Sequence, residues 1–212
     1  MNHPNWRTYL VTQESLSAGR STVDVVRAAI EGGVDVVQLR EKGTDARWRY
    51  ELGLELRELT AEAGVDLLVN DRVDVAQTID ADGVHLGDSD LPVAAARELL
   101  GPEAVIGYST ADPEEATRAQ EAGADYLGVG AVYGTTSKKD VDDEQNGIGL
   151  ERVRAVAEAV EIPVIGIGGI TAGNAAPVVE AGATGVAVIS AVTAADDPKG
   201  ATAALAKEVS HD

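Results

Sequence analysis

The sequence predicts a single-domain (β/α)8 barrel, an α/β fold in which eight parallel strands alternate with helices across residues 1–212. Three observations support this: short β-rich runs, amphipathic stretches between them, and a phrase that recurs where a helical stretch gives way to a β-rich run. The phrase reads EGGVD at 31–35, EAGVD at 62–66, EAGAD at 121–125 and EAGAT at 180–184. Glycine here can adopt the left-handed conformation that ends a helix, so each copy marks the approach to a strand.

The strands follow in order from this phrase. Its copies begin 31, 59 and 59 residues apart, and each longer gap holds two strand–helix units, which adds strands at 83–86 and 162–165. Apolar runs at 8–11 and 104–107 complete the set. The sequence therefore predicts eight strands near residues 8, 35, 67, 84, 105, 126, 163 and 186.

Helices are predicted between these strands at 22–31, 46–63, 93–100, 113–122, 150–160 and 172–181, whereas the segment after Asp71 has room for a short helix only. This alternation is typical of a parallel sheet whose strands are buried on both faces, and eight units favour closure into a barrel. A doubly wound open sheet is the alternative. It usually has a glycine-rich turn after its first strand, where this chain has TQES at 12–15.

The composition excludes several classes of function. The chain has 17 basic and 36 acidic residues, a net charge of −19 and no cysteine. The lack of cysteine excludes disulfides, a thiolate nucleophile and a cysteine-ligated metal, and the charge argues against nucleic-acid partners. No apolar run reaches the length of a membrane span and the first 15 residues lack a signal-peptide pattern, so we expect a cytoplasmic protein. Such acidity fits a halophilic source, because high salt screens the self-repulsion.

Function in a (β/α)8 barrel gathers where strands run into the following helices, and basic residues concentrate at these positions. Lys42, Lys138 and Lys139 are three of only five lysines, and all fall on strand-end loops. Gln38 and Arg40 alternate with Lys42, so the three share one face. A fork-shaped arginine and a point-charge lysine suit a diphosphate. Solvated strand ends are the alternative interpretation.

Two carboxylates end neighbouring strands. Asp71 follows the third strand and Asp90 the fourth. Two carboxylates that face one cavity repel each other unless a cation lies between them, and Mg²⁺ held by two carboxylates and substrate phosphates would fit. With 36 acidic residues in the chain, ordinary surface acids are the alternative.

A phosphate cradle is predicted after strands seven and eight. Gly168 and Gly169 would let backbone N–H groups approach an anion, and Ile189 and Ser190 end the neighbouring strand. A tight turn that needs positive φ is the alternative. Before Lys138, three hydroxyl-bearing residues would either bind a ligand or make turn hydrogen bonds; they are Thr135, Thr136 and Ser137.

Serine–histidine catalysis is not expected. Ser109 ends the fifth strand, but the sequence offers it no plausible base, since His3 and His211 lie at the termini and His85 lies within the fourth strand. We interpret His85 as an interior histidine rather than a general base.

Taken jointly and in order, these motifs resemble the thiamine phosphate synthase family from Tyr9 to about Ala194. The resemblance rests on QLREK at 38–42, ND at 70–71, GVHLG at 83–87 with Asp90, TTSKKD at 135–140 and GIGGI at 166–170. It implies a (β/α)8 barrel that joins 4-amino-2-methyl-5-hydroxymethylpyrimidine diphosphate to 4-methyl-5-(2-phosphoethyl)thiazole, or to its carboxylated form. The products would be thiamine phosphate and pyrophosphate, with Mg²⁺ as cofactor.

The resemblance also assigns roles to residues. Asp71 and Asp90 would hold Mg²⁺, and Asp88-Ser89 departs from the Gln-Glu common in the family. The catalytic group would be Arg40, Lys42, Ser109 and Lys138. The pyrimidine diphosphate would lie against Gln38, Leu39, Arg40, Glu41, Lys42, Asn70, Ser109 and Lys138. The thiazole phosphate would lie against Thr135, Thr136, Ser137, Gly169, Ile189 and Ser190.

The expected mechanism is a Mg²⁺-assisted, carbocation-like substitution at the pyrimidine methylene, with two small phosphorylated substrates as partners and no nucleic acid or membrane. A thiazole tautomerase-like barrel, a phosphosugar isomerase and a non-catalytic phosphate-ligand binding protein are the alternatives. A tautomerase would not need Arg40, Lys42, Asp71, Asp90 and Lys138 together. An isomerase would want an acid–base pair suited to ring opening, and no clear pair appears, whereas a phosphate-ligand binding protein would keep the glycine turn but could lose the metal pair. The sequence leaves the oligomeric state open, a homo-oligomer included.

Overall fold

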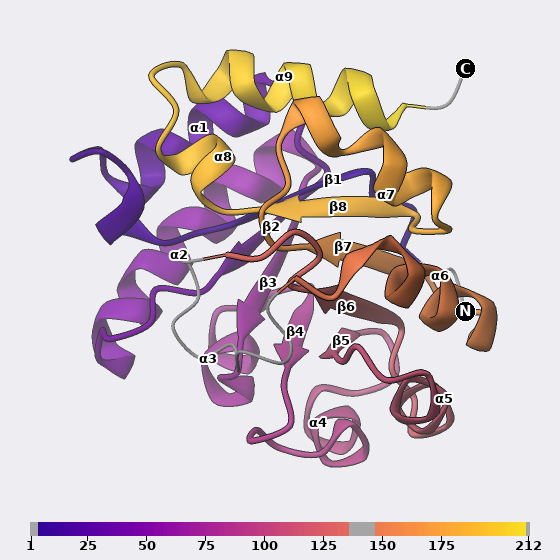
Figure 1. Cartoon of the computed structure of the whole chain (residues 1–212). Helices are drawn as coiled ribbons and strands as arrows, with labels where there is room; N and C mark the ends of the chain where they lie inside the picture. The colour runs from indigo at the N-terminus through magenta and orange to yellow at the C-terminus, as the bar shows by residue number, and fades with distance from the viewer. Residues whose placement is uncertain (1–3, 136–146, 211–212) are drawn as a thin grey trace.

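Eight parallel strands pair in chain order, and β8 pairs back with β1 to close a barrel in the computed structural model (Figure 1). The structure describes residues 4–135 and 147–210. The predicted (β/α)8 barrel is thereby confirmed, and the open sheet is excluded. The strands are β1 Thr8–Val11, β2 Val36–Leu39, β3 Asp66–Asn70, β4 Gly83–Leu86, β5 Val105–Ser109, β6 Tyr126–Gly130, β7 Val164–Ile167 and β8 Gly185–Val188.

Helices surround the barrel (Figure 1). Most begin and end within a residue of the predicted limits. They are α1 Thr22–Glu31, α2 Ala46–Ala63, α3 Val73–Thr78, α4 Val93–Leu100, α5 Pro113–Glu121, α6 Gly149–Ala159, α7 Ala176–Glu180, α8 Ser190–Thr193 and α9 Pro198–Val209, with short 3₁₀ turns η1 Glu14–Leu16 and η3 Ala172–Asn174. In the described part of the chain, no helix is long and apolar enough to cross a bilayer.

The prediction at 172–181 is wrong in one respect, because the segment is divided into η3 and α7. Thr171 and Asn174 cap η3 reciprocally. Pro177 then falls in the first turn of α7, where the missing N–H of proline is tolerated. The sequence analysis also missed the short α8 and the longer α9, which packs beside α1 (Figure 1) and buries Leu205 and Val209.

The recurrent phrase performs two tasks at the amino-terminal end of the barrel. Its glycines have positive φ, for example +89° at Gly33 and +96° at Gly123, which ends the preceding helix. In the first and third copies, the aspartate then accepts a hydrogen bond from a backbone N–H at the start of the preceding strand. The Asp35 carboxylate lies 2.8 Å from the Thr8 nitrogen, and the Asp125 carboxylate lies 2.8 Å from the Ile106 nitrogen. These two copies of the phrase therefore end a helix and link two adjacent strands.

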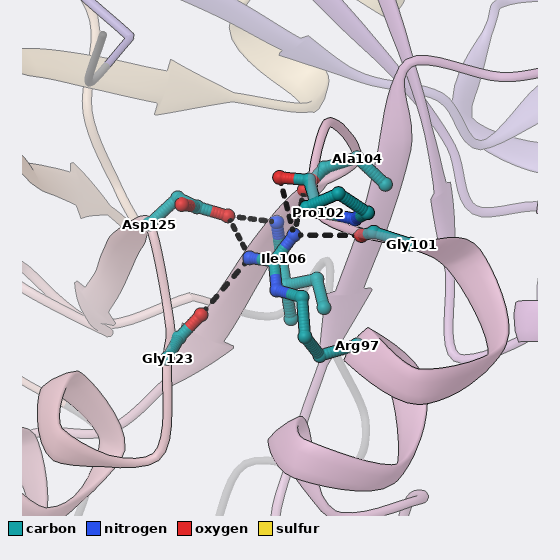
Figure 2. Close-up of polar contacts among 7 residues, drawn as sticks. All are labelled: Arg97, Gly101, Pro102, Ala104, Ile106, Gly123 and Asp125. Carbon is teal, nitrogen blue, oxygen red and sulfur yellow. Dashed lines mark hydrogen bonds and ion pairs between the residues drawn. The ribbon is translucent and has the colours of Figure 1, made fainter. Parts of the chain in front are cut away.

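Arg97, on α4, reinforces the link at Asp125 (Figure 2). Its Nη2 donates to the Asp125 carboxylate at 2.5 Å and to the Gly123 carbonyl at 3.0 Å. Its Nη1 donates to backbone carbonyls of the loop before β5, namely those of Gly101, Pro102 and Ala104. One guanidinium therefore joins the loops that precede β5 and β6.

The core has two layers. The larger lies between the strands and the helices and includes the fully buried Leu39 and Leu56. The smaller fills the barrel interior, where Trp6 stands edge-on to two tyrosines, with ring centroids 5.7 Å from Tyr9 and 5.2 Å from Tyr126. Aromatic rings therefore close the amino-terminal end of the barrel interior.

Candidate active site

A cavity of about 1260 Å³ opens at the carboxyl ends of the strands. This exceeds the roughly 300–1,000 Å³ of a typical single-ligand pocket, so it has room for two small ligands. It gathers residues that are far apart in the sequence. Among the predicted site residues, those that line it are Arg40, Lys42, Asn70, Asp71, Asp90, Ser109, Thr135, Gly169, Ile189 and Ser190.

The motif QLREK is split by the alternation of the extended chain. Arg40 and Lys42 face the cavity. Leu39 is fully buried in the outer core, and the Glu41 carboxylate accepts hydrogen bonds from Thr22 Oγ1 at 2.8 Å and from the Glu14 nitrogen at 2.9 Å. The expectation that Leu39 and Glu41 contact the pyrimidine diphosphate is therefore corrected for their side chains, which point toward the helices.

Gln38 also lies apart from the cavity wall. It is 4 % exposed, and its Nε2 donates to the Tyr9 hydroxyl at 2.6 Å inside the barrel. Its Nε2 therefore contacts Tyr9, and its contact with a ligand stays a prediction.

One wall of the cavity is basic. Arg40 is buried there and donates to Gln13 Oε1 at 3.1 Å. The Lys42 ammonium lies 3.7 Å from the Asp71 carboxylate. Between these cations and the strand end, the Asn70 Nδ2 is buried and has no hydrogen-bond partner within the described residues. Buried donors are almost always satisfied, so this amide indicates a ligand that accepts a hydrogen bond.

Asp71 and Asp90 meet beside this wall. Asp71 has a left-handed backbone, with φ +63°, which aspartate tolerates better than most residues. Burial raises the pKa of the Asp71 carboxyl, and the negative charge of Asp90 raises it further, while Lys42 and Arg40 oppose the shift. Asp90 is held in place by the Gly87 N–H, 2.7 Å from its carboxylate.

This pair fits a divalent cation of the Mg²⁺ type. Nowhere in the described chain do three or more His, Cys, Asp or Glu residues form a metal cluster. Mg²⁺ commonly uses one or two carboxylates and completes its shell with water and phosphate oxygens. A cation between Asp71 and Asp90 would relieve the repulsion that raises the Asp71 pKa.

The opposite wall contains the predicted glycine turn. Gly168 and Gly169 have φ of +102° and +66°. A Cβ on Gly168 would lie 2.5 Å from the Ala131 Cβ, and one on Gly169 would lie 2.4 Å from the Gly134 carbonyl oxygen. The tight-turn interpretation is thus correct for both glycines, and the turn also lines the cavity beside Ile189 and Ser190. Thr136, Ser137, Lys138 and Lys139 lie outside the described residues.

Ser109 does have a histidine partner, contrary to the sequence interpretation. His85 Nε2 lies 2.8 Å from Ser109 Oγ, and His85 Nδ1 lies 2.7 Å from the Tyr126 hydroxyl. The sequence argument missed this because β4 and β5 are adjacent only once the barrel has formed, with His85 opposite Gly107 in the register. His85 is an interior histidine as expected, but its ring reaches the cavity.

Comparisons with known proteins agree with this geometry. The family model described as thiamine monophosphate synthase matches residues 8–192. The chain belongs to the thiamine monophosphate synthase family. It is 65 % identical over 201 residues to the thiamine-phosphate synthase of Haloarcula marismortui, covering 95 % of both chains, and 65 % identical over 201 residues to that of Natronomonas pharaonis, covering 95 % of this chain and 94 % of the other.

Solved structures agree as well. The thiamine phosphate pyrophosphorylase from Pyrococcus furiosus superposes with a TM-score of 0.87 at 43 % identity, covering 97 % of this chain and 96 % of the other. A tryptophan synthase from Mycobacterium tuberculosis, at 16 % identity and a TM-score of 0.69 over 97 % of this chain and 93 % of the other, shares the fold alone. Thiamine monophosphate synthases are transferases of thiamine biosynthesis, so this chain is an enzyme of that kind.

The cavity also has wall residues that the sequence analysis did not single out. Glu115, from the first turn of α5, accepts hydrogen bonds from Thr110 Oγ1 at 2.5 Å and from the Tyr108 hydroxyl at 3.0 Å. Arg152 reaches the wall from α6. Both residues lie in the first turn of a helix that follows a strand, and the sequence could have suggested them on that ground. Many other acidic residues have similar positions, however, so Glu115 does not stand out.

Proposed function

We propose that the enzyme joins 4-amino-2-methyl-5-hydroxymethylpyrimidine diphosphate to 4-methyl-5-(2-phosphoethyl)thiazole, or its carboxylated form, and releases thiamine phosphate and pyrophosphate. One observation carries the proposal: a single cavity sets the cations Arg40 and Lys42 beside the Asp71–Asp90 pair, and the glycine turn at Gly168 opposite them. Such a cavity suits a diphosphate with a cation on one side and a monophosphate on the other.

The diphosphate side would be held by donors of this chain. Arg40 offers a planar fork, Lys42 a point charge, and Asn70 the buried Nδ2 that lacks a partner in the described structure. Mg²⁺, held by Asp71 and Asp90, would neutralise negative charge on the diphosphate oxygens when bound. Lys138, which lies outside the described residues, is proposed to add a further cation.

The reaction needs no protein nucleophile. The bond between the pyrimidine methylene carbon and the diphosphate oxygen breaks, and its electron pair leaves with pyrophosphate. The 4-amino group of the pyrimidine donates electron density to the methylene carbon, so a carbocation-like path is favoured. The thiazole nitrogen then forms the new bond with its lone pair. The protein stabilises the developing charge on the leaving group through Arg40, Lys42 and Lys138 and brings the two rings together.

The thiazole phosphate would occupy the other wall. Gly169, Ile189 and Ser190 line it in the described structure, and Thr135, Thr136 and Ser137 are proposed to contribute from the β6 side. The acidic composition supports a salt-rich working environment.

The decisive experiment mixes the purified enzyme with both substrates and Mg²⁺ in high salt and measures both products. Thiamine phosphate and pyrophosphate should appear in equal amounts, and omission of either substrate should abolish thiamine phosphate formation. Addition of a chelator should slow the reaction strongly. A thiazole tautomerase would release no pyrophosphate, so thiazole turnover without pyrophosphate would favour that alternative and overturn the proposal.

A further inference from the structure

A continuous line of hydrogen bonds crosses the barrel interior and ends at the cavity. Gln38 Nε2 lies 2.6 Å from the Tyr9 hydroxyl, which lies 2.9 Å from the Tyr126 hydroxyl. The Tyr126 hydroxyl lies 2.7 Å from His85 Nδ1, and His85 Nε2 lies 2.8 Å from Ser109 Oγ. The five side chains come from five different strands. We call this line the Gln38–Ser109 relay.

The relay is built into the fold rather than left by chance. A Cβ on Gly107 would lie 2.2 Å from Cζ and 2.4 Å from the hydroxyl of Tyr126, and a Cβ on Gly128 would lie 3.0 Å from Cε1 of His85. These two strand glycines therefore leave the space that the Tyr126 and His85 rings occupy. Trp6 packs edge-on against the rings of both tyrosines.

The Gln38 amide determines which group donates at each step. An amide nitrogen only donates, so Tyr9 accepts from Gln38 and its own proton is free for Tyr126. Tyr126 then donates to His85 Nδ1, which makes Nδ1 an acceptor and places the imidazole hydrogen on Nε2. Nε2 donates to Ser109, whose own hydroxyl proton is left to point into the cavity.

The reverse order leaves a buried donor unsatisfied. If Tyr126 donated to Tyr9, Tyr9 would accept twice, and its proton would have no acceptor in the described chain. Tyr9 is 2 % exposed, so water does not replace that acceptor, and such a loss is costly. Burial also raises the pKa of both phenols, which keeps their protons in place. Donor and acceptor would exchange along the whole relay only if the Gln38 amide were rotated so that its oxygen faced the Tyr9 hydroxyl.

We propose that Gln38, Tyr9, Tyr126 and His85 are positioning residues that hold Ser109 as a hydrogen-bond donor to an acceptor atom of the ligand. An unprotonated ring nitrogen of a pyrimidine is such an atom, and this part rests on the proposed function. Because His85 Nε2 already carries a hydrogen, it does not take the Ser109 proton. Ser109 is therefore a donor to the substrate and not a histidine-activated nucleophile.

The first test measures the tautomer of His85 in the full chain by ¹⁵N NMR with labelled histidine, with His85→Gln to assign its signals. A neutral imidazole with the hydrogen on Nε2 is expected. A hydrogen on Nδ1, or on both nitrogens, would overturn the proposal. The measurement requires no substrate, so its failure is distinct from a failure to form thiamine phosphate.

The second test compares three tyrosine-to-phenylalanine variants. Tyr126→Phe removes the donor to His85, so the single tautomer should be lost and kcat/KM should fall about tenfold, as for one lost hydrogen bond. Tyr9→Phe should keep the tautomer, because Tyr126 retains its proton. Tyr50→Phe, on the exposed face of α2, should change neither. A Tyr126→Phe enzyme with the wild-type tautomer, or a Tyr9→Phe enzyme that loses it, would overturn the relay. Should Tyr126→Phe not fold, the wild-type tautomer and Tyr9→Phe still decide.

Discussion

Asp71 shows how a single residue combines local strain with an electrostatic cost. Its left-handed φ of +63° turns the chain immediately after β3, and this brings its carboxylate next to that of Asp90. Both features are unfavourable in isolation. Stability of the fold alone does not explain why Asp71 has both features. A cation bound between Asp71 and Asp90 would compensate for the electrostatic repulsion between the two carboxylates.

Substitution Asp71→Asn tests this. The amide keeps the left-handed conformation but removes the charge, so the Mg²⁺ concentration for half-maximal activity should rise about tenfold or more, as for loss of one metal-orienting group. Because burial and Asp90 raise the pKa of Asp71, its charged form is disfavoured in the folded state. Without Mg²⁺, the variant should therefore unfold at the same or a higher temperature.

The matched control is Asp80→Asn, since Asp80 is also left-handed, with φ +54°, but is exposed and outside the cavity. It should leave the Mg²⁺ titration unchanged. Identical titrations of Asp71→Asn, Asp90→Asn and wild type would show that the metal is held elsewhere.

Lys138 is the second residue whose role can be tested directly. Lys138→Ala should lower kcat by about 10²-fold or more, as for loss of one group that stabilises transition-state charge. Lys207→Ala, on the exposed side of α9, is the control for loss of a lysine. Steady-state kinetics with both substrates saturating would separate an effect on kcat from one on KM. An unchanged kcat would remove Lys138 from the mechanism.

At the scale of elements, the sequence predicted strands better than helices. Each strand of the barrel is a short apolar run beside a glycine or turn, and all eight were located. The helix division at Pro177 depends on a capping pair, Thr171 and Asn174, that periodicity does not show. The site was predictable where strand ends carry polar residues, such as Arg40 and Asp71. The His85–Ser109 contact was not, because it depends on the register between β4 and β5.

Arg97 is the element-scale test of stability. Arg97→Leu would remove the bonds to Asp125 and to the loop carbonyls and leave that half-buried carboxylate without its cation, so we expect a loss of about 2 kcal/mol in the free energy of unfolding. The exposed pair of Arg118 with Glu114 is the control, because Arg118→Leu should cost about 0.5 kcal/mol or less. Urea unfolding of both variants measures this. Equal losses of unfolding free energy in the two variants would contradict the role given to Arg97. The KM of the Arg97→Leu enzyme should not change, because Arg97 lies at the end of the barrel opposite the cavity.

At the scale of the whole molecule, the net charge of −19 coexists with a basic wall inside the cavity. The acidity lies on outer faces, for instance on α2, where Glu51, Glu55, Glu58 and Glu62 are all exposed at positions that include like-charged i, i+4 pairs. Average charge therefore excludes large polyanions without excluding small phosphorylated substrates.

Salt should stabilise the folded enzyme for this reason. The free energy of unfolding should rise as KCl increases from low to molar concentration, because shorter Debye lengths reduce repulsion between surface carboxylates. A variant with Glu55→Gln and Glu62→Gln should show a flatter salt dependence and higher stability at low salt. A stability that is independent of KCl in the wild type would contradict this interpretation of the acidic surface.

The aspartates that precede alternate strands also divide the barrel into pairs. Asp35 links β1 to β2 and Asp125 links β5 to β6, and Asp82, just before β4, accepts the Leu67 N–H of β3 at 2.7 Å. Before β8 the corresponding residue is Thr184, which has no carboxylate. The β7–β8 pair should therefore open first in local fluctuations. Val164, which lies opposite Thr184 in the register, is the amide that corresponds to Thr8, Leu67 and Ile106, and its hydrogen exchange should be faster than theirs.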